Sequence, residues 1–334
     1  MSVRVAVVGA GNWGRNHVRT FADLAGAELT AICDQSEDVR ARMQATYPGT
    51  HVSPNIDEAL EASDAVVIAT DAPSHADLAR QALAAGRHVL VEKPLTLTSE
   101  ESSELCELAR SSERVLMVGH LLLYHSAIRE LRALIEAGEL GDVLYMVCRR
   151  LNLGVVRQRE NAWWSLAPHD LSIARYLFGN EPTSAAASAG TFLQKGIADV
   201  VFGTVRFGDS QLAHIHVSWL DPHKVRSLTV VGSKKMATFD DTSPDQKLVV
   251  FDKGAVPPQT LSYADGVRVR TGDIRIPAIR LVEPLRSQCT DFIESIRDGR
   301  RPVADGASGL AVVRALEAGQ RSLEAGGEEV AIAP

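Results

Sequence analysis

The sequence predicts an α/β protein: a doubly wound parallel sheet at the N-terminal end, then an α+β domain with a large, open, mostly antiparallel sheet. Strand-like and helical segments alternate through the first third of the 334 residues, which is typical of a parallel sheet. A glycine-rich turn joins the first strand to the first helix. After Gly119 the pattern changes to successive strands with short turns. We therefore expect one domain over 1–119 and a second over 120–334.

The first strand, Val3–Val8, leads directly into Gly9, Gly11 and Gly14, and a helical pattern continues to about Leu24. The first glycine permits a tight turn, the second lets the backbone approach a pyrophosphate, and the third lets the helix pack closely on the strand. The phosphates then lie at the positive end of the helix. This arrangement predicts a dinucleotide site.

An acidic residue at the end of the second strand indicates which dinucleotide is bound. Strand 28–33 ends at Asp34, roughly 20 residues beyond Gly14, which is the spacing of a ribose-binding acid. A carboxylate there accepts hydrogen bonds from both ribose hydroxyls and repels a 2′-phosphate. Because no Arg or Lys follows it directly, we expect NAD rather than NADP. The alternative, a strand, turn and helix without a ligand, is disfavoured because all these features occur together.

The remaining elements continue these two patterns. In the first domain we expect strands near 51–52 and over 65–70, 88–91 and 115–118, with helices over 37–46, 55–61, 74–85 and 98–111. In the second domain we expect strands over 143–151, 185–193, 200–207, 211–219, 226–231, 237–240, 248–251 and 329–332, with helices over 124–137, 166–178, 281–297 and 307–325. The proline-containing segment 254–277 is interpreted as a loop with strand fragments.

Composition limits the classes of partner and compartment. The net charge of −7 gives no support for a nucleic-acid-binding role. The four cysteines lie far apart without metal-ligand spacing, so we expect no metal site and a reducing environment. No apolar run reaches membrane-spanning length, and no basic, apolar leader precedes the first strand. The sequence therefore predicts a soluble, cytoplasmic protein.

Two residues are candidates for the chemistry. Lys93 lies just beyond strand 88–91, at the carboxyl end where ligands of parallel sheets bind, and can stabilise charge on a substrate oxygen. His169, expected at the start of helix 166–178 with Pro168 in its first turn, can take the proton of an alcohol while hydride leaves the carbon. A solvated lysine and a capping or core histidine are the alternatives.

Taken together, these residues resemble the glucose-fructose oxidoreductase, inositol dehydrogenase and rhizopine-catabolism family over nearly the whole chain. The resemblance rests on the early GxGxxG, on Asp34, on AVVIATDAPSHADLARQALAAGRHVLVEKPL at 65–95 and on the helix with His169. It implies a Rossmann domain, a C-terminal α/β domain whose open sheet forms oligomer contacts, and hydride transfer between nicotinamide and a sugar or cyclitol carbon. It also implies catalytic roles for Lys93 and His169 and a cis bond between Lys93 and Pro94.

One position departs from the family pattern. Many members carry an aspartate four residues before the histidine, where this chain has Ser165. A serine cannot serve as the carboxylate of a dyad. We therefore expect His169 to work alone, or with Asp170 as its electrostatic partner.

Within the family, GNWGRNHVR at 11–19, VGHLLLYHSAI at 118–128 and WWSLAPHDLSI at 163–173 resemble the nucleotide-sugar 3-dehydrogenases. Those enzymes oxidise the 3-hydroxyl of UDP-N-acetylglucosamine or its uronic acid, ahead of transamination to a 3-amino sugar. The resemblance implies oxidation of a UDP-sugar, with arginines between Arg149 and Arg159 facing the diphosphate. The alternatives are a dehydrogenase or ketoreductase of another sugar or inositol, and an NAD-binding regulator without turnover.

The candidate site residues divide by role. We expect catalysis by Lys93 and His169. The residues expected to bind the cofactor are Gly9, Gly11, Asn12, Trp13, Gly14, Asp34, Thr70, His75, Glu92 and Lys93. Those expected to contact the substrate are Lys93, Tyr124, Arg149, Arg157 and Asp170. We also expect a homodimer or homotetramer formed through the C-terminal sheet, with no metal, nucleic acid or membrane as partner.

Overall fold

The computed structural model describes residues 2–256 and 268–333 of the chain. It divides into two compact units. Unit 1 comprises Met1–Tyr124 and Val282–Arg314, and unit 2 comprises His125–Leu281 and Ala315–Pro334. We expected everything after residue 119 to form one second domain; instead, Val282–Arg314 belongs to the first unit.

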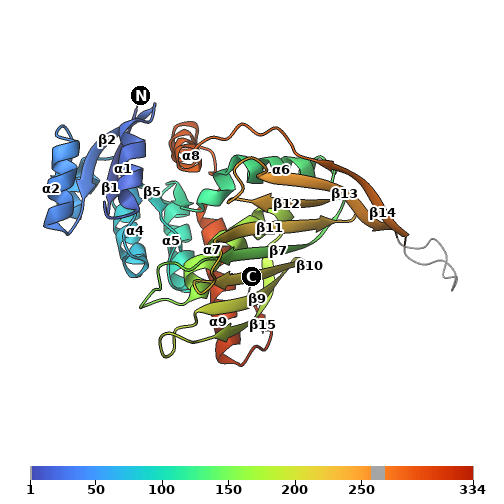
Figure 1. Ribbon diagram of the computed structural model, residues 1–334. Coiled ribbons are helices and arrows are strands. Elements are labelled where there is room, and N and C mark those ends of the chain that lie inside the picture. Colours follow the sequence, from blue (N-terminus) through green and yellow to red (C-terminus); the bar gives the residue numbers. More distant parts are fainter. Residues whose placement is uncertain (1, 257–267, 334) are drawn as a thin grey trace. The chain divides into compact units, whose positions relative to one another are not determined.

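Unit 1 contains a six-stranded parallel sheet in the order β3-β2-β1-β4-β5-β6 (Figure 1). Its strands are β1 (Val3–Val8), β2 (Ala27–Cys33), β3 (His51–Ser53), β4 (Ala65–Ile68), β5 (His88–Val91) and β6 (Leu116–Val118). Its helices are α1 (Gly14–Ala22), α2 (Glu37–Thr46), α3 (Ile56–Glu61), α4 (His75–Ala84), α5 (Ser99–Ser111) and α8 (Pro284–Asp298), with the short 3₁₀ helices η1 (Ala72–Ser74) and η2 (Leu121–Tyr124). The strand order reverses between β1 and β4, and doubly wound sheets bind ligands at the carboxyl ends beside such a reversal.

The strands of this sheet are buried on both faces. Val5, Val7, Val66, Leu90 and Met117 are all 0 % exposed. Parallel strands covered by helices on both sides need continuous apolar runs, which is why these segments could be recognised from sequence. The predicted parallel sheet is confirmed.

The segment Val282–Arg314 returns to unit 1 because its polar groups find their partners there. The carboxylate of Asp291 on α8 accepts hydrogen bonds from Tyr124 Oη (2.7 Å) and from Val303 N (2.9 Å). It also pairs with Arg300 Nη1 (2.6 Å). These partners lie far from Asp291 in the sequence or on the other side of a turn, so no local pattern indicated the return.

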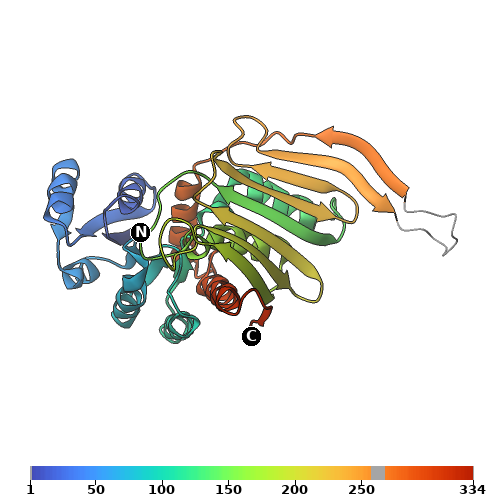
Figure 2. The same cartoon turned by 60° about the horizontal axis from the view of Figure 1, so that its bottom comes forward.

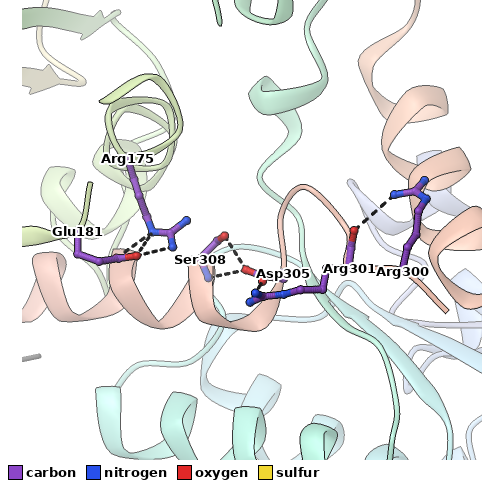
Figure 3. Close-up of polar contacts among 6 residues, drawn as sticks. All are labelled: Arg175, Glu181, Arg300, Arg301, Asp305 and Ser308. Atoms are coloured by element: carbon purple, nitrogen blue, oxygen red, sulfur yellow. Dashed lines mark hydrogen bonds and ion pairs between the residues drawn. The ribbon is translucent and has the colours of Figure 1, made fainter. Parts of the chain in front are cut away.

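The same segment runs beside β6 before entering a long helix. Val118 N donates to Ala304 O (2.8 Å), which satisfies the edge of the sheet. Asp305 then precedes α9 (Gly306–Glu324), and its carboxylate accepts hydrogen bonds from Ser308 N (2.8 Å) and Ser308 Oγ (2.7 Å) (Figure 3). The division between the two units falls within α9.

Unit 2 contains a nine-stranded sheet in the order β14-β13-β12-β11-β7-β10-β9-β8-β15 (Figure 2). Only β7 and β10 pair in parallel among these described strands, so the expected mostly antiparallel sheet is confirmed. The strands are β7 (Val143–Leu151), β8 (Pro182–Gly190), β9 (Val200–Phe207), β10 (Gln211–Ser218), β11 (Val225–Gly232), β12 (Met236–Asp240), β13 (Leu248–Val256), β14 (Arg268–Arg275) and β15 (Val330–Ala331). The helices that begin in unit 2 are α6 (Ser126–Glu136) and α7 (Ala162–Phe178).

The segment 254–277, interpreted as a loop with strand fragments, contributes residues to two strands. Its ends extend β13 and form β14, which pair antiparallel, and 257–267 lies outside the described residues. The sequence of β14, RVRTGDIR, has few large apolar residues, so pairing with β13 rather than hydrophobicity makes it a strand. Among the described residues, no helix has both the length and the hydropathy to cross a membrane.

One face of the nine-stranded sheet is covered and the other is open. On the covered face α7 packs on β7, β9 and β10, and its Trp163 is 0 % exposed. Gly203 on β9 and Gly319 on α9 leave room for this ring, because a Cβ on either would lie 2.6 Å from it. On the opposite face no helix of the described part of unit 2 covers the sheet (Figure 2). Tyr145 and Phe202, which alternate with the buried residues of β7 and β9, are 42 % and 43 % exposed.

Candidate active site

The turn between β1 and α1 excludes a side chain at two of its three glycines. Gly9 has φ +84°, and a Cβ on it would lie 2.8 Å from Thr70 Cγ2. A Cβ on Gly14 would lie 1.7 Å from the carbonyl oxygen of Gly9. Gly11, in contrast, has nothing within 4 Å of its added Cβ, so the fold alone does not require glycine there. Open space at this position is what an approaching pyrophosphate needs, and the turn therefore fits the predicted dinucleotide.

Asp34 is fixed at the end of β2, beside this turn. Its Oδ2 accepts from Ala10 N (2.7 Å) and its Oδ1 accepts from Ser36 N (2.9 Å). Arg40 on α2 donates from Nη1 to the carbonyl oxygens of Asp34 (2.8 Å) and Gln35 (2.9 Å). We did not predict this arginine, because we searched only the residues directly after Asp34. Its place in the first turns of the following helix was the available signal.

Lys93 follows β5, and the Lys93–Pro94 peptide bond is cis, as the family resemblance implied. Lys93 N donates to Glu92 Oε2 (3.2 Å). Glu92 Oε1 accepts from Trp13 Nε1 (2.7 Å) and lies 2.8 Å from His17 Nε2. Glu92 and Trp13 were both predicted to bind the cofactor, and their side chains are bonded to each other. His17 was not predicted, although it lies one helical turn beyond Trp13.

Two further predicted cofactor residues lie in the turn after β4. Thr70 Oγ1 lies 2.7 Å from Ser74 Oγ, within this turn. His75 is only 1 % exposed, with Nδ1 2.8 Å from Pro94 O and Nε2 3.1 Å from Thr70 O. Burial lowers the pKa of His75, against the opposite effect of the two carbonyls. The ring of His75 is therefore enclosed and links the segment after β4 to the segment after β5, and its expected contact with the cofactor stays a prediction. Asn12, by comparison, is exposed in the glycine turn.

In unit 2, His169 lies inside α7 rather than at its start. The helix begins at Ala162, because Asn161 caps it by accepting from Trp164 N (3.1 Å). Pro168 is consequently an interior helix residue and not a residue of the first turn, which corrects our expectation. His169 is half-buried. The sequence signal that we missed was Asn161, an N-cap residue located before two tryptophans.

Asp170, the next residue on α7, forms a bidentate ion pair with Arg150 on β7. Arg150 Nε and Nη2 donate to its two carboxylate oxygens (3.1 and 2.9 Å). Asp170 is 2 % exposed. Burial acts to lower the pKa of Arg150, but the charge and the hydrogen bonds of Asp170 outweigh it and raise that pKa. The carboxylate of Asp170 therefore binds Arg150, and its expected roles toward His169 and the substrate stay predictions.

Removal of this carboxylate has a predictable cost. We expect Asp170→Ala to lower the free energy of unfolding by about 3–5 kcal/mol, because Arg150 would remain buried without its counter-ion. Glu107→Ala is the matched control: Glu107 pairs with Arg110 in the open, where water and salt screen such a pair and its loss changes stability little. Urea denaturation of the two variants measures the difference. Equal losses would contradict the buried-pair interpretation.

The other predicted substrate residues are dispersed. Arg149 lies on the open face of the sheet, opposite α7, beside His216 of β10. The ring of His216 stacks on Phe202 at 4.3 Å on that same face. Arg157 lies in the loop before α7, half-exposed and 3.4 Å from Glu160. Arg150, in contrast, faces α7 and binds Asp170 there.

Tyr124 is 1 % exposed in unit 1, and its hydroxyl donates to Asp291 (2.7 Å) and accepts from Ala304 N (3.3 Å). These contacts give it an interior packing role, and the expected substrate contact stays a prediction. In the described part of the chain, no cluster of three or more His, Cys, Asp or Glu side chains could hold a metal ion.

Two family models match the chain. The model described as an oxidoreductase family with an NAD-binding Rossmann fold, GFO_IDH_MocA, matches residues 3–120. The model of the GFO/IDH/MocA C-terminal domain matches residues 128–238. Together they cover more than half of the chain.

Relatives and solved structures agree with these models. The UDP-N-acetylglucosamine 3-dehydrogenase of Acidithiobacillus ferrooxidans is 29% identical over 94% of this chain and 95% of its own. The inositol 2-dehydrogenase of Rhizobium meliloti is 25% identical over 97% of each chain. A solved structure of the Acidithiobacillus enzyme has a TM-score of 0.82 at 26% identity, covering 98% of this chain and 99% of its own. GenD2 from gentamicin A biosynthesis, solved in complex with NAD, shares the fold at 24% identity, with a TM-score of 0.83 over 100% of this chain and 97% of its own.

Proposed function

We propose that this chain, which belongs to the GFO/IDH/MocA family of oxidoreductases, transfers hydride between NAD and a secondary alcohol of a sugar. The observation that carries the proposal is the common edge of the parallel sheet. Lys93 follows β5, the glycine turn follows β1 and Asp34 follows β2, and all three are at carboxyl ends of parallel strands. Because ligands of such sheets bind at this edge, an amine donor accompanies the predicted dinucleotide site.

Each residue has a defined task in this proposal. The turn at Gly9, Gly11 and Gly14 binds the pyrophosphate, and Asp34 accepts the ribose hydroxyls. Bound NAD supplies the hydride acceptor. Lys93 donates a hydrogen bond to the reacting oxygen and stabilises the negative charge that develops there.

His169 takes the hydroxyl proton in the direction of oxidation and returns it in the direction of reduction. Neither residue sets the direction of the reaction. Since Ser165 replaces the family aspartate and Asp170 is bonded to Arg150, we propose that His169 acts without a carboxylate from either position.

We further propose that the substrate is a UDP-sugar oxidised at C3. The support is the likeness, over nearly the whole length, to a UDP-N-acetylglucosamine 3-dehydrogenase. The inositol 2-dehydrogenase match is almost as strong and keeps a free cyclitol as the second candidate. Arg157, half-exposed in the loop before α7, is our candidate for a diphosphate contact. If Arg157→Ala left the KM for the UDP-sugar unchanged, Arg157 would no longer be a candidate for this contact.

An assay of NAD reduction tests the proposal. The purified chain is incubated with NAD and, separately, UDP-N-acetylglucosamine, UDP-glucose, myo-inositol and glucose, and the absorbance of reduced nicotinamide is followed. We expect turnover to be fastest with a UDP-sugar. Turnover with myo-inositol and none of the sugars would reject the UDP-sugar as substrate but would still support a dehydrogenase. Tight NAD binding without reduction by any compound would favour the regulator.

The preference for NAD rests on Asp34 and can be measured separately. We expect Asp34→Ala to raise the Kd for NAD at least about tenfold, because hydrogen bonds to a charged group contribute about 1.5–3 kcal/mol. Binding of NADP should change less or improve, since the carboxylate no longer repels its 2′-phosphate and Arg40 is near. Calorimetric titration of both dinucleotides gives the ratio. A wild type that binds NADP more tightly would contradict the assignment.

The open face of the nine-stranded sheet is our candidate for self-association into a homodimer or homotetramer. Tyr145 and Phe202 are large side chains exposed on it, and such exposed apolar surface often marks an interface. Light scattering gives the mass in solution. The four thiols, Cys33, Cys106, Cys148 and Cys289, are free, which fits the proposed cytoplasmic location.

A further inference from the structure

The carboxylate of Glu92 lies inside unit 1 directly beside Lys93, and the proposed mechanism gives it no task. Its side chain is only 12 % exposed. Oε2 accepts from the backbone N–H of Lys93 (3.2 Å), and Oε1 accepts from Trp13 Nε1 (2.7 Å). His17 Nε2 lies 2.8 Å from the same Oε1. Three groups from two parts of the chain, the start of α1 and the segment after β5, therefore converge on one buried carboxylate.

The electrostatics of this cluster fix the direction of the hydrogen bonds. Burial acts to raise the pKa of Glu92, but the hydrogen bonds from His17 and Trp13 and the positive charge of Lys93 outweigh it and lower that pKa. Glu92 is thus ionised, and an ionised carboxylate can only accept. His17 must therefore carry its proton on Nε2 and donate it to Glu92.

Neither His17 nor Glu92 has space to turn away. His17 is 0 % exposed, with its ring stacked on Phe21 at 6.4 Å and with Cys289 Sγ 3.9 Å from its Nδ1. The carboxyl group of Glu92 is pressed against Gly119 after β6, where an added Cβ would lie 2.8 Å from it. This rigidity is what a residue needs to fix the position of another.

We propose that Glu92 is a positioning residue for Lys93, and that His17 and Trp13 act through it by holding its carboxylate. The idea rests on the proposed function, since it assigns Lys93 the reacting oxygen. Trp13 belongs to the glycine turn after β1 and Lys93 follows β5, so the network connects the dinucleotide turn to the backbone of Lys93, past the intervening strand β4. A loss of this connection displaces Lys93 without removing it, and small displacements of this kind cost turnover more than binding.

The test uses two substitutions at His17 with opposite properties. His17→Phe keeps a flat ring that stacks on Phe21 but donates no hydrogen bond. His17→Gln loses the ring but keeps an amide N–H near the position of Nε2. If the bond to Glu92 positions Lys93, His17→Phe should lower kcat about tenfold or more, and His17→Gln should retain most of the wild-type kcat. The Kd for NAD should change little in both variants. If His17 serves packing alone, Phe should be the better replacement.

Trp13→Phe removes the second side-chain donor to Glu92 and tests the proposal even if His17→Phe does not fold. It should lower kcat by a larger factor than it raises the Kd for NAD. Two control variants remove hydrogen bonds of the same kinds at other positions. His51→Phe removes the exposed hydrogen bond between His51 and Glu58 (2.8 Å), and Trp219→Phe removes the hydrogen bond from the indole of Trp219 to Asp199 (2.6 Å). Neither control should alter kcat, although Trp219→Phe should lower the Tm. Equal kcat in the wild type, His17→Phe and Trp13→Phe would overturn the proposal.

Hydrogen exchange separates this inference from the proposed function. Exchange of the Lys93 amide, followed by mass spectrometry of peptides covering 89–95, needs no substrate. We expect faster exchange in His17→Phe and near-wild-type exchange in His17→Gln. If this exchange pattern were found in a protein without activity on any sugar, it would support the hydrogen-bond network around Glu92 and contradict the proposed dehydrogenase function. Unchanged exchange in His17→Phe would reject the network even in an active enzyme.

Discussion

Replacing Lys93 by methionine is expected to lower kcat for sugar oxidation by about 10²–10³-fold, with little change in the Kd for NAD. Methionine has nearly the same length as lysine but has no N–H donor, so it removes the stabilisation of the charged oxygen while preserving the packing. Steady-state kinetics with the best substrate of the panel, together with calorimetric titration of NAD, separates the two effects.

Lys234→Met is the matched control for this substitution. Lys234 is exposed in the turn between β11 and β12, and we assign it no role in the reaction. It should retain the kcat of the wild type. If Lys93→Met also retained it, the amine would not be part of the chemistry, and the observation that carries the proposed function would be lost.

The parallel sheet could be predicted because its evidence is local. Ala65–Ile68 is apolar at every position and Val3–Val8 at every position except Arg4, and that pattern is needed only where helices cover both faces. The return of Val282–Arg314 to unit 1 could not be predicted in this way. It depends on bonds such as Asp291 with Tyr124, which join residues far apart in the sequence.

The candidate site shows the same limit. Gly9, Gly14 and Asp34 could be found because a turn and its strand fix their spacing. The choice between Arg149 and Arg150 depended on the phase of one strand, in which neighbouring side chains face opposite sides. Every residue from Val143 to Cys148 is apolar or aromatic, so the sequence did not indicate the phase of β7. In the structure Met146 and Cys148 are both 0 % exposed, and Arg150, in the same phase, faces α7.

Two glycine substitutions in the turn after β1 should have opposite consequences, and this contrast tests the dinucleotide site itself. In Gly14→Ala the new Cβ would lie 1.7 Å from the carbonyl oxygen of Gly9, a backbone atom that no side-chain rotation can move. We expect a loss of at least about 1–3 kcal/mol in the free energy of unfolding, because α1 must shift away from β1. NAD binding should fall with it.

Gly11→Ala should leave stability unchanged but weaken NAD binding about tenfold or more, the equivalent of about 1.4 kcal/mol. Its Cβ meets nothing within 4 Å, so only an approaching ligand would contact it. Gly49→Ala, equally open, is the control and should affect neither property. Thermal unfolding and calorimetric titration measure both for all three variants. If Gly11→Ala bound NAD as the wild type does, the pyrophosphate would not pass over this turn. If Gly14→Ala were as stable as Gly49→Ala, the close approach of α1 to the turn would be excluded.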